Sequence, residues 1–236
     1  DHVEDSGAKT TGFLGYSYDI DANWKALASV STAFLAPSVY QVYDPDSGNK
    51  GLKAESSTNY EAGIQYASGK NQVRLTVFEN HIRDQIAYYS GHYDNIGRVK
   101  NTGVELNAQS DVFGWFDLKA NVTWQNPKDR EQDQRLIRRS KWFGTVEVSK
   151  TLGAWYLGAD ISYNSSRSDL VSDPAYQSHL VDLGSYTLVD LNARYDVTKN
   201  FAIYARIENL FDKQYETNYG YNQWGRAGFV GIEVKM

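Results

Sequence analysis

Hydrophobic and polar residues alternate along most of the chain, with the period of two that an extended β-strand imposes. In WFDLKANVTWQ, residues 115–125, one face of such a strand carries Phe116, Leu118, Ala120, Val122 and Trp124. The opposite face carries Asp117, Lys119, Asn121, Thr123 and Gln125. The same alternation recurs in residues 154–163, 187–195 and 226–236. It predicts strands with one apolar and one polar face throughout the chain.

We expect about eleven strands from this alternation. They lie near residues 8–19, 22–34, 57–68, 71–82, 98–110, 114–125, 141–151, 153–164, 185–197, 199–208 and 225–236. Short turns at 19–21, 68–70, 111–113, 152–153 and 198–199 alternate with long polar loops near 35–56, 83–97, 126–140, 165–184 and 209–224. Short periplasmic turns and long extracellular loops are typical of outer-membrane barrels. The predicted fold is therefore all-β, an antiparallel transmembrane β-barrel.

A soluble β-sandwich is the alternative fold, in which the apolar faces would form a core. Aromatic residues near the ends of the apolar faces favour the barrel, because such rings settle at the level of the lipid headgroups. The chain has no run of 18 apolar residues, so no transmembrane helix is predicted. Low mean hydropathy is compatible with a barrel, since only alternate residues of each strand face lipid.

The odd number of predicted strands leads to an expectation about the chain as a whole. The last strand runs towards the periplasm, so an odd count places residue 1 outside the cell, whereas a complete bacterial barrel has an even count. An unpaired strand edge in lipid would also leave backbone groups unsatisfied. We therefore expect residues 1–236 to be the C-terminal portion of a larger barrel.

Several segments resemble the TonB-dependent outer-membrane receptors. A strand end and loop entry of that family resemble residues 31–43, STAFLAPSVYQVY. Two of its strand motifs resemble residues 51–66, GLKAESSTNYEAGIQY, and residues 97–109, GRVKNTGVELNAQ. RLIRRSKWFGTVEV (135–148) resembles another strand start, with Ser140 where proline is usual. Residues 188–236, which include NLFDKQY, resemble the closing hairpin. YETNYGYNQWGR (215–226) most resembles the cobalamin (vitamin B12) receptors of the family.

The resemblance implies a barrel of about 22 strands with an N-terminal plug and a TonB box, of which this chain would hold the C-terminal strands. Its implied function is active uptake of a scarce bulky solute, a cobalamin or a ferric siderophore, across the outer membrane of a Gram-negative bacterium. The implied partners are the plug, the remaining strands, TonB acting through the plug, a small-molecule ligand, lipid and lipopolysaccharide. The alternatives are a passive plugless pore, or a scaffold that closes with fewer strands.

Composition narrows the other classes of function. The chain has no cysteine, which excludes disulfide bonds and thiolate sites. Its net charge of −5 does not indicate the basic surface that nucleic-acid binding requires. His2, His81, His92 and His179 are scattered, with no metal-ligand spacing. Neither a phosphate loop nor a nucleophile elbow is present. We therefore predict no enzyme and no cofactor.

Aromatic residues in the predicted loops are the candidate ligand contacts, because rigid amphipathic rings give large contact areas at a low entropic cost. They are Tyr40, Tyr43, Tyr88, Tyr89, Tyr93, Tyr176, Tyr219, Tyr221 and Trp224. The alternative is that these rings belong to the outer aromatic girdle or to loop packing. In NLFDKQY (209–215), Asn209 and Asp212 are instead expected to tie a structural corner by bonding nearby backbone.

Three charged groups complete the candidate sites. Asp44, Asp46 and Glu55 superficially imitate a calcium loop, although a solvated turn with Pro45 and Gly48 is the alternative. Arg138, Arg139 and Lys141 either pair with lipopolysaccharide phosphates or lie in a solvated loop. Mid-strand charges would be costly in lipid, so they are expected to line the lumen. They are Glu105, Asp160, Asp190, Arg194, Arg206 and Glu233.

Overall fold

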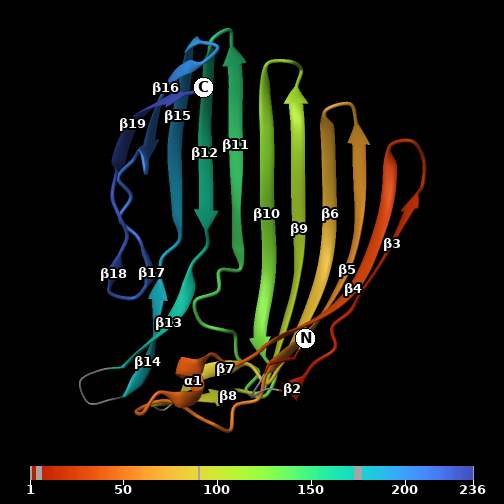
Figure 1. Cartoon of the computed structure of the whole chain (residues 1–236), viewed down its shortest axis with the longest axis vertical. Coiled ribbons are helices and arrows are strands. Elements are labelled where there is room, and N and C mark those ends of the chain that lie inside the picture. The colour runs from red at the N-terminus through yellow and green to blue at the C-terminus, as the bar shows by residue number, and fades with distance from the viewer. Residues whose placement is uncertain (1, 4–6, 90, 173–176, 236) are drawn as a thin grey trace. The chain divides into compact units, whose positions relative to one another are not determined.

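The computed structural model describes residues 2–3, 7–89, 91–172 and 177–235. Within these residues an eleven-stranded antiparallel sheet is the main element, and β3 and β19 stand at the two ends of its strand order (Figure 1). In chain order its strands are β3 (Phe13–Asp19), β4 (Trp24–Leu35), β5 (Glu55–Ser68), β6 (Asn71–Arg83), β9 (Arg98–Val112), β10 (Phe116–Asp129), β11 (Trp142–Leu152), β12 (Trp155–Asn164), β15 (Tyr186–Thr198), β16 (Phe201–Glu208) and β19 (Ala227–Val234). Each strand pairs with its sequence neighbours within the sheet. The predicted antiparallel all-β class and the eleven strands are confirmed.

The predicted loops contain short elements that alternation did not indicate. A five-residue helix, α1 (Val39–Tyr43), follows β4, and small hairpins occupy three other connections. The hairpins are β7 (Ile86–Tyr89) with β8 (His92–Asn95), β13 (Arg167–Ser172) with β14 (Ser178–Leu183), and β17 (Glu216–Asn218) with β18 (Tyr221–Asn222). β1 (His2–Val3) pairs with β2 (Gly7–Ala8) near the N-terminus. No helix in the described residues is long and apolar enough to cross a membrane.

The chain divides into two compact units. Unit 1 comprises residues 1–64, 76–104 and 125–136, and unit 2 comprises 65–75, 105–124 and 137–236. In unit 2 the short turns β9–β10, β11–β12 and β15–β16 lie at one end of the strands, and the hairpins β13/β14 and β17/β18 lie towards the other end (Figure 1). In unit 1, α1 and the hairpin β7/β8 lie beside each other beyond the strand ends (Figure 1). Short and long connections thus alternate as predicted.

Strand register in unit 2 separates an apolar face from a polar one. Across β12 and β15, Leu157 lies opposite Ala193 and Ile161 opposite Val189. Across β16 and β19, Ile203 lies opposite Ile232. Leu157, Ile161, Ile203 and Ile232 are exposed, Ile232 at 66%, whereas Val189 and Ala193 are half-buried. An exposed row of paired aliphatic residues is what a lipid-facing surface requires.

Few side chains form a conventional core. Among the described residues, the buried hydrophobic ones are Ala54, Val99, Leu183 and Ala202. Most large apolar side chains are instead exposed on strand faces. The backbone ladder and the surrounding lipid, rather than a compact interior, therefore account for this architecture.

Candidate functional site

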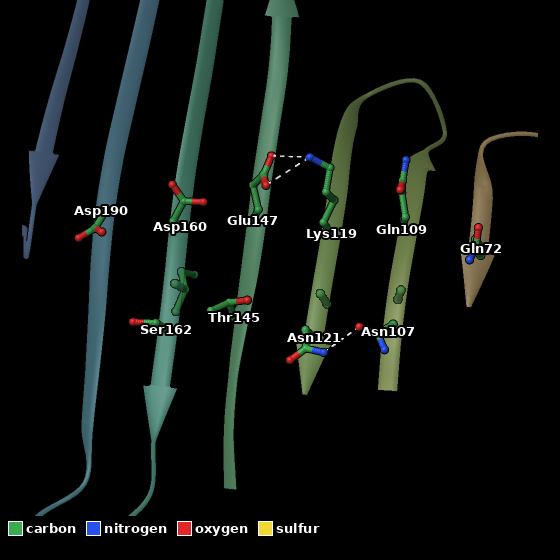
Figure 2. Close-up of a pocket in the computed structure, with 13 residues that line it drawn as sticks. Gln72, Asn107, Gln109, Lys119, Asn121, Thr145, Glu147, Asp160, Ser162 and Asp190 are labelled. Carbon is green, nitrogen blue, oxygen red and sulfur yellow. Dashed lines mark hydrogen bonds and ion pairs between the residues drawn. The ribbon is translucent and has the colours of Figure 1, made fainter. Parts of the chain in front are cut away.

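The polar face of unit 2 forms a pocket of about 560 Å³ (Figure 2). Its labelled side chains come from neighbouring strands and project from the same side of the sheet. The polar lining residues are Gln72, Asn107, Gln109, Lys119, Asn121, Thr145, Glu147, Asp160, Ser162 and Asp190. The charged residues Asp160 and Asp190 therefore lie opposite the aliphatic face, as the alternation predicted.

Charges on this polar face are paired or hydrogen-bonded across strands. The Lys119 Nζ atom lies 3.1 Å from Glu147 Oε1. Asp160 and Asp190 lie directly opposite each other in the strand register, so their like charges repel each other. Asn192 Nδ2 donates to Asp160 at 3.0 Å, and the backbone N–H of Asn209 donates to Asp190 at 2.7 Å. These donors offset the repulsion and leave an acidic strip on the face.

Asn209 organises the corner after β16. It is buried and has a φ of 48°, a left-handed conformation that asparagine tolerates. Its Oδ1 accepts from the N–H of Lys213 at 2.8 Å, and its Nδ2 donates to the Lys213 carbonyl at 3.0 Å. Asp212 Oδ1 accepts from the N–H of Arg226 at 2.8 Å, which joins the corner to the start of β19. NLFDK is a structural corner, as its Asn and Asp positions indicated.

Asp169 joins three loop segments of unit 2. Its side chain is 1% exposed, and Arg138 Nε donates to its Oδ1 at 2.6 Å. The N–H of Leu170 donates to the same oxygen at 2.8 Å, and the N–H of Tyr219 donates to Oδ2 at 2.9 Å. The carboxylate therefore ties the loop before β11 to the hairpins β13/β14 and β17/β18. We call Asp169 with these three partners the Asp169 node.

Burial and hydrogen bonding act on the pKa of Asp169 in opposite directions. Removal from water favours the neutral acid and alone would raise the pKa. The N–H of Tyr219, the Arg138 guanidinium and the N–H of Leu170 favour the carboxylate, and together they hold the pKa below its usual value. The node is therefore charged under ordinary conditions.

Arg167 makes a second connection between the same hairpins. It is buried, and its Nη2 donates to the carbonyl of Glu216 at 2.5 Å. Its guanidinium lies 5.4 Å from the ring centroid of Tyr186, within the range of a cation–π contact. The Tyr186 ring in turn packs on Tyr215, with 4.4 Å between centroids. Burial and the neighbouring Tyr186 raise the pKa of the Tyr215 hydroxyl.

Ser140 has a structural role at the position where the resembled family usually has proline. Its side chain is buried, and its hydroxyl donates to the carbonyl of Ser165 at 3.0 Å. The hydroxyl of Ser165 accepts from the N–H of Trp142 at 3.0 Å. These bonds fix the start of β11 against the end of β12, and a proline side chain could not make the first of them.

Neutral amides hold the loops of unit 1 together. Asn95 Nδ2 donates to the carbonyls of Lys53 and Asp84 at 3.0 and 2.7 Å, and its Oδ1 accepts from the N–H of Lys53 at 2.9 Å. Asn49 Nδ2 donates to the carbonyl of Tyr93 at 3.0 Å. The N–H of Tyr93 donates to the carbonyl of Ser47 at 2.9 Å. The segment after α1 is thereby bonded to the hairpin β7/β8.

Three of the predicted ligand-contact tyrosines gather in unit 1. Tyr93 makes edge contacts with Tyr40 at 6.1 Å and with Tyr88 at 5.3 Å between ring centroids. Tyr40 and Tyr88 are nevertheless about 60% exposed. The Tyr43 ring lies under the Lys50 ammonium, at 5.7 Å from the ring centroid. Tyr40, Tyr88 and Tyr93 thus form a partly exposed aromatic cluster.

The remaining aromatic candidates lie mainly on the β17/β18 hairpin of unit 2. Tyr219, Tyr221 and Trp224 are all exposed, Trp224 at 82%. Only the backbone of Tyr89 is described, in β7, and Tyr176 lies outside the described residues. Among the described residues, the candidate rings therefore include a group in unit 1 and a group in unit 2.

The calcium candidates have other partners. Asp44 Oδ2 accepts from the hydroxyl and the N–H of Ser47 at 2.6 and 3.0 Å, and the Ser47 hydroxyl lowers the pKa of Asp44. Glu55 Oε1 accepts from the N–H of Ile86 at 2.9 Å. In the described part of the chain, no three His, Asp or Glu side chains are placed to hold a metal ion. The structure does not bring Asp44, Asp46 and Glu55 together as a metal site.

The lipopolysaccharide candidates also separate in the structure. All three are exposed, and Arg138, with a φ of 57°, also belongs to the Asp169 node. The sequence reasoning missed Arg167, Asp169, Asn49 and Asn95, which hold the loops in place. Short Leu-Val pairs in residues 167–172 and 178–183 could have indicated the β13/β14 hairpin that carries two of them.

Comparison with known proteins identifies the family. Residues 1–210 match the model of the TonB dependent receptor-like β-barrel. The vitamin B12 transporter BtuB of Photobacterium profundum is 32% identical over 100% of this chain and 39% of its own length. That of Vibrio vulnificus is 30% identical over 89% of this chain and 35% of its own length. The chain therefore spans less than two fifths of the length of these curated relatives.

Solved structures show the same fold at lower sequence identity. The ferripyoverdine receptor of the outer membrane of Pseudomonas aeruginosa superposes with a TM-score of 0.77 at 22% identity, over 94% of this chain and 32% of that one. The copper transporter OprC superposes with a TM-score of 0.79 at 20% identity, over 95% of this chain and 39% of that one. Together with the sequence match over most of its length, these findings show that the chain belongs to the TonB-dependent receptor-like β-barrel family.

Proposed function

We propose that the chain is the C-terminal barrel portion of a TonB-dependent receptor that takes up a cobalamin, with a ferric siderophore as the other class of solute. The observation that carries the proposal is the similarity to vitamin B12 transporters, about 30% identity across nearly the whole chain. The siderophore and copper receptors of known structure share about 20%. The place of action is the outer membrane of a Gram-negative bacterium.

The two aromatic groups are the proposed first contacts for the solute. The Tyr40–Tyr88–Tyr93 cluster and the exposed rings of Tyr219, Tyr221 and Trp224 offer flat apolar surface at the loop end of each unit. A cobalamin has a broad macrocycle with amide substituents, so rings with polar groups beside them fit it. The Asp169 node supports this role by fixing the backbone of Tyr219.

The polar face of unit 2 is the proposed contact surface for a plug domain. Its acidic strip, with Asp160, Asp190 and the Lys119–Glu147 pair, would be costly against lipid but suits a hydrated partner. Energised movement of such a plug, rather than anything in this chain, would supply the transport step. The barrel strands and loops would bind the solute and hold the plug.

The test uses the full-length protein in a strain without its own cobalamin receptor. We expect saturable uptake of labelled cyanocobalamin that stops when a protonophore collapses the proton gradient. Uptake that survives the protonophore unchanged would indicate a passive pore instead. Absence of cyanocobalamin uptake together with saturable uptake of a ferric siderophore would move the proposal to the other solute class.

A matched pair of substitutions tests the loop contacts. W224A should weaken cyanocobalamin binding about tenfold, as expected when a well-placed aromatic contact is lost. F113A is the control, because Phe113 is also highly exposed, at 93%, but lies in the short β9–β10 turn at the other end of the strands of unit 2. Equal binding by the wild type and W224A would contradict a role for Trp224.

A further inference from the structure

The outward face of β6 can be followed along the strand into unit 1. Val73 and Leu75, in the part of β6 that belongs to unit 2, and Val77, in the part that belongs to unit 1, share one parity and are exposed, as expected for a face towards lipid. The same parity continues through Glu79 and His81 to Arg83, the last residue of β6. The face thus changes from aliphatic to charged as the strand approaches the loop end.

Contacts between strands place other cations on this face. Lys100 Nζ of β9 lies 2.8 Å from Glu79 Oε2, and His81 Nε2 lies 2.6 Å from Glu79 Oε1. Arg98, two residues from Lys100, has the same parity and is the first residue of β9. Residues two apart on a strand share a face. Arg98 therefore lies on the same face as Arg83, beside the loops.

Arg130 joins this group from the end of β10. Its backbone N–H donates to the carbonyl of Arg98 at 2.8 Å, which makes the two arginines opposite neighbours across the strands. Like charges in that position repel each other unless an anion lies between them. The arrangement is therefore unfavourable in the protein alone.

These residues line a pocket of about 410 Å³ within unit 1. Its permanent charges are four cations, Arg83, Arg98, Lys100 and Arg130, and one carboxylate, Glu131. Lys100 is paired with Glu79. The guanidinium groups of Arg83, Arg98 and Arg130 form no hydrogen bond or ion pair with any residue that the structure describes. Three unpaired guanidinium groups around one hollow are suited to an anion with several oxygens.

The apolar surface next to the pocket indicates which kind of molecule bears the anionic group. On β5, Tyr60 and Ile64 share a parity and are 51% and 40% exposed. The Tyr60 ring contacts His81 edge-on, at 6.1 Å between centroids, which puts both on the same face. A tyrosine where an aliphatic band ends marks the level of lipid headgroups. The cations therefore lie where phosphates of a lipid would be, with its acyl chains over the band below.

We propose that Arg83, Arg98 and Arg130 bind the phosphate groups of lipopolysaccharide on the outward face of unit 1. The proposal rests on the outer-membrane location and not on the identity of the solute. Arg binds phosphate with two parallel N–H donors, so three such groups can hold two phosphates on one lipid. Of the cations that the sequence suggested for this role, Arg138 is already engaged by Asp169.

The test measures lipid binding to the full-length protein in detergent by native mass spectrometry. The probes are lipid A with two phosphates, lipid A with one phosphate, phosphatidylethanolamine and inorganic phosphate. The variant is R83Q/R98Q/R130Q, and R139Q/K141Q is the control from the other loop group. We expect at least tenfold weaker binding of the two-phosphate lipid A by the triple variant, a smaller loss for the one-phosphate form and no loss for phosphatidylethanolamine.

The control variant should bind the two-phosphate lipid A as the wild type does. Equal binding by the triple variant and the wild type, or an equal loss in the control, would overturn the proposal. Displacement of lipid A by millimolar inorganic phosphate would assign the pocket to free phosphate instead. If the triple variant does not fold, R130Q is compared with R139Q, and equal affinity of these two overturns the proposal. Cyanocobalamin binding should not change in any of these variants, which separates this result from the proposed function.

Discussion

The loop groups of the two units are held in chemically different ways. In unit 2, the buried carboxylate of Asp169 accepts from a guanidinium and two backbone N–H groups. In unit 1, the neutral side chain of Asn95 bonds three backbone groups of two segments. Both are single side chains that join separate segments, yet only the first carries a charge.

This difference has two consequences for the loops. Hydrogen bonds to a buried charge are stronger than hydrogen bonds between neutral groups. Removing one partner of a buried charge therefore lowers stability by more than removing one partner of a neutral pair. A carboxylate also titrates, whereas an amide does not. The loops of unit 2 should therefore depend more on one residue and should respond to acid. The loops of unit 1, which contain more exposed carboxylate bonds at Asp44 and Glu55 beside the amide of Asn95, should lose less when a single residue is changed.

The largest expected effect is that of D169N. The amide NH₂ group of the new side chain would face N–H donors, so at least one donor of the node loses its partner. We expect the hairpins β13/β14 and β17/β18 to open more easily by about 3 kcal/mol. Hydrogen exchange at the amides of Leu170 and Tyr219 measures this, with the solvent-exposed amides of the hairpins as internal reference.

D182N is the matched control for this change. Asp182 lies on the paired strand β14 and is exposed, with one 3.3 Å hydrogen bond from the Ser168 hydroxyl. Its substitution should change the free energy of opening of the hairpins, measured by hydrogen exchange, by less than about 0.5 kcal/mol. Similar effects of D169N and D182N would show that the buried charge does not hold these loops.

A smaller loss is expected in unit 1 from N95A. The substitution removes three hydrogen bonds at once, but all are neutral and Asn95 is only partly buried. We expect about 2 kcal/mol easier opening of the β7/β8 hairpin, measured by exchange at the amides of Lys53 and Ile96. K53A is the control, because the bonds to Lys53 use its backbone and survive loss of its side chain. An effect of N95A as large as that of D169N would remove the distinction between the units.

The strands were predictable because alternation is a local property. Residues 153–164 were predicted as a strand, and β12 spans Trp155–Asn164. The largest misplacement was the start of β3, predicted near residue 8 and found at Phe13, and the next was the end of β10, predicted near residue 125. The strand continues to Asp129, since the carbonyl of Pro127 still accepts from the N–H of Leu136 and the ladder to β9 persists at Arg130.

The loop contacts were not predictable from the same pattern. Asp169 and Tyr219 are separated by 50 residues, and no local period shows that they meet. The corner at Asn209 was predictable, because its bonds reach only four residues along the chain. The aromatic candidates were found by residue type, but only the three-dimensional contacts divide them into two groups. Contacts between residues close in sequence can be predicted from the sequence, whereas contacts between distant loops can be identified only from the three-dimensional structure.

Acid should open the hairpins that the Asp169 node holds. The pKa of Asp169 is held below its usual value, so the node stabilises unit 2 fully above about pH 4. The stabilisation is then lost as the pH falls through the lowered pKa. Hydrogen exchange, corrected for the intrinsic rate, should show opening of β13/β14 and β17/β18 in this acid range. D169N should abolish the acid step, and its persistence in D169N would assign it to another group.

The smallest expected effect concerns the aromatic cluster of unit 1. Y93L keeps the backbone bonds of Tyr93 to Ser47 and Asn49 but removes two edge contacts, with Tyr40 and Tyr88. Such ring contacts contribute about 1 kcal/mol beyond their buried area, so the β7/β8 hairpin should open more easily by about that amount. Y221L in unit 2 is the control, because Tyr221 is 71% exposed and its ring makes no aromatic contact with a described residue. If Y93L leaves exchange unchanged, the hydrogen bonds alone hold this loop, and the rings are free for a ligand.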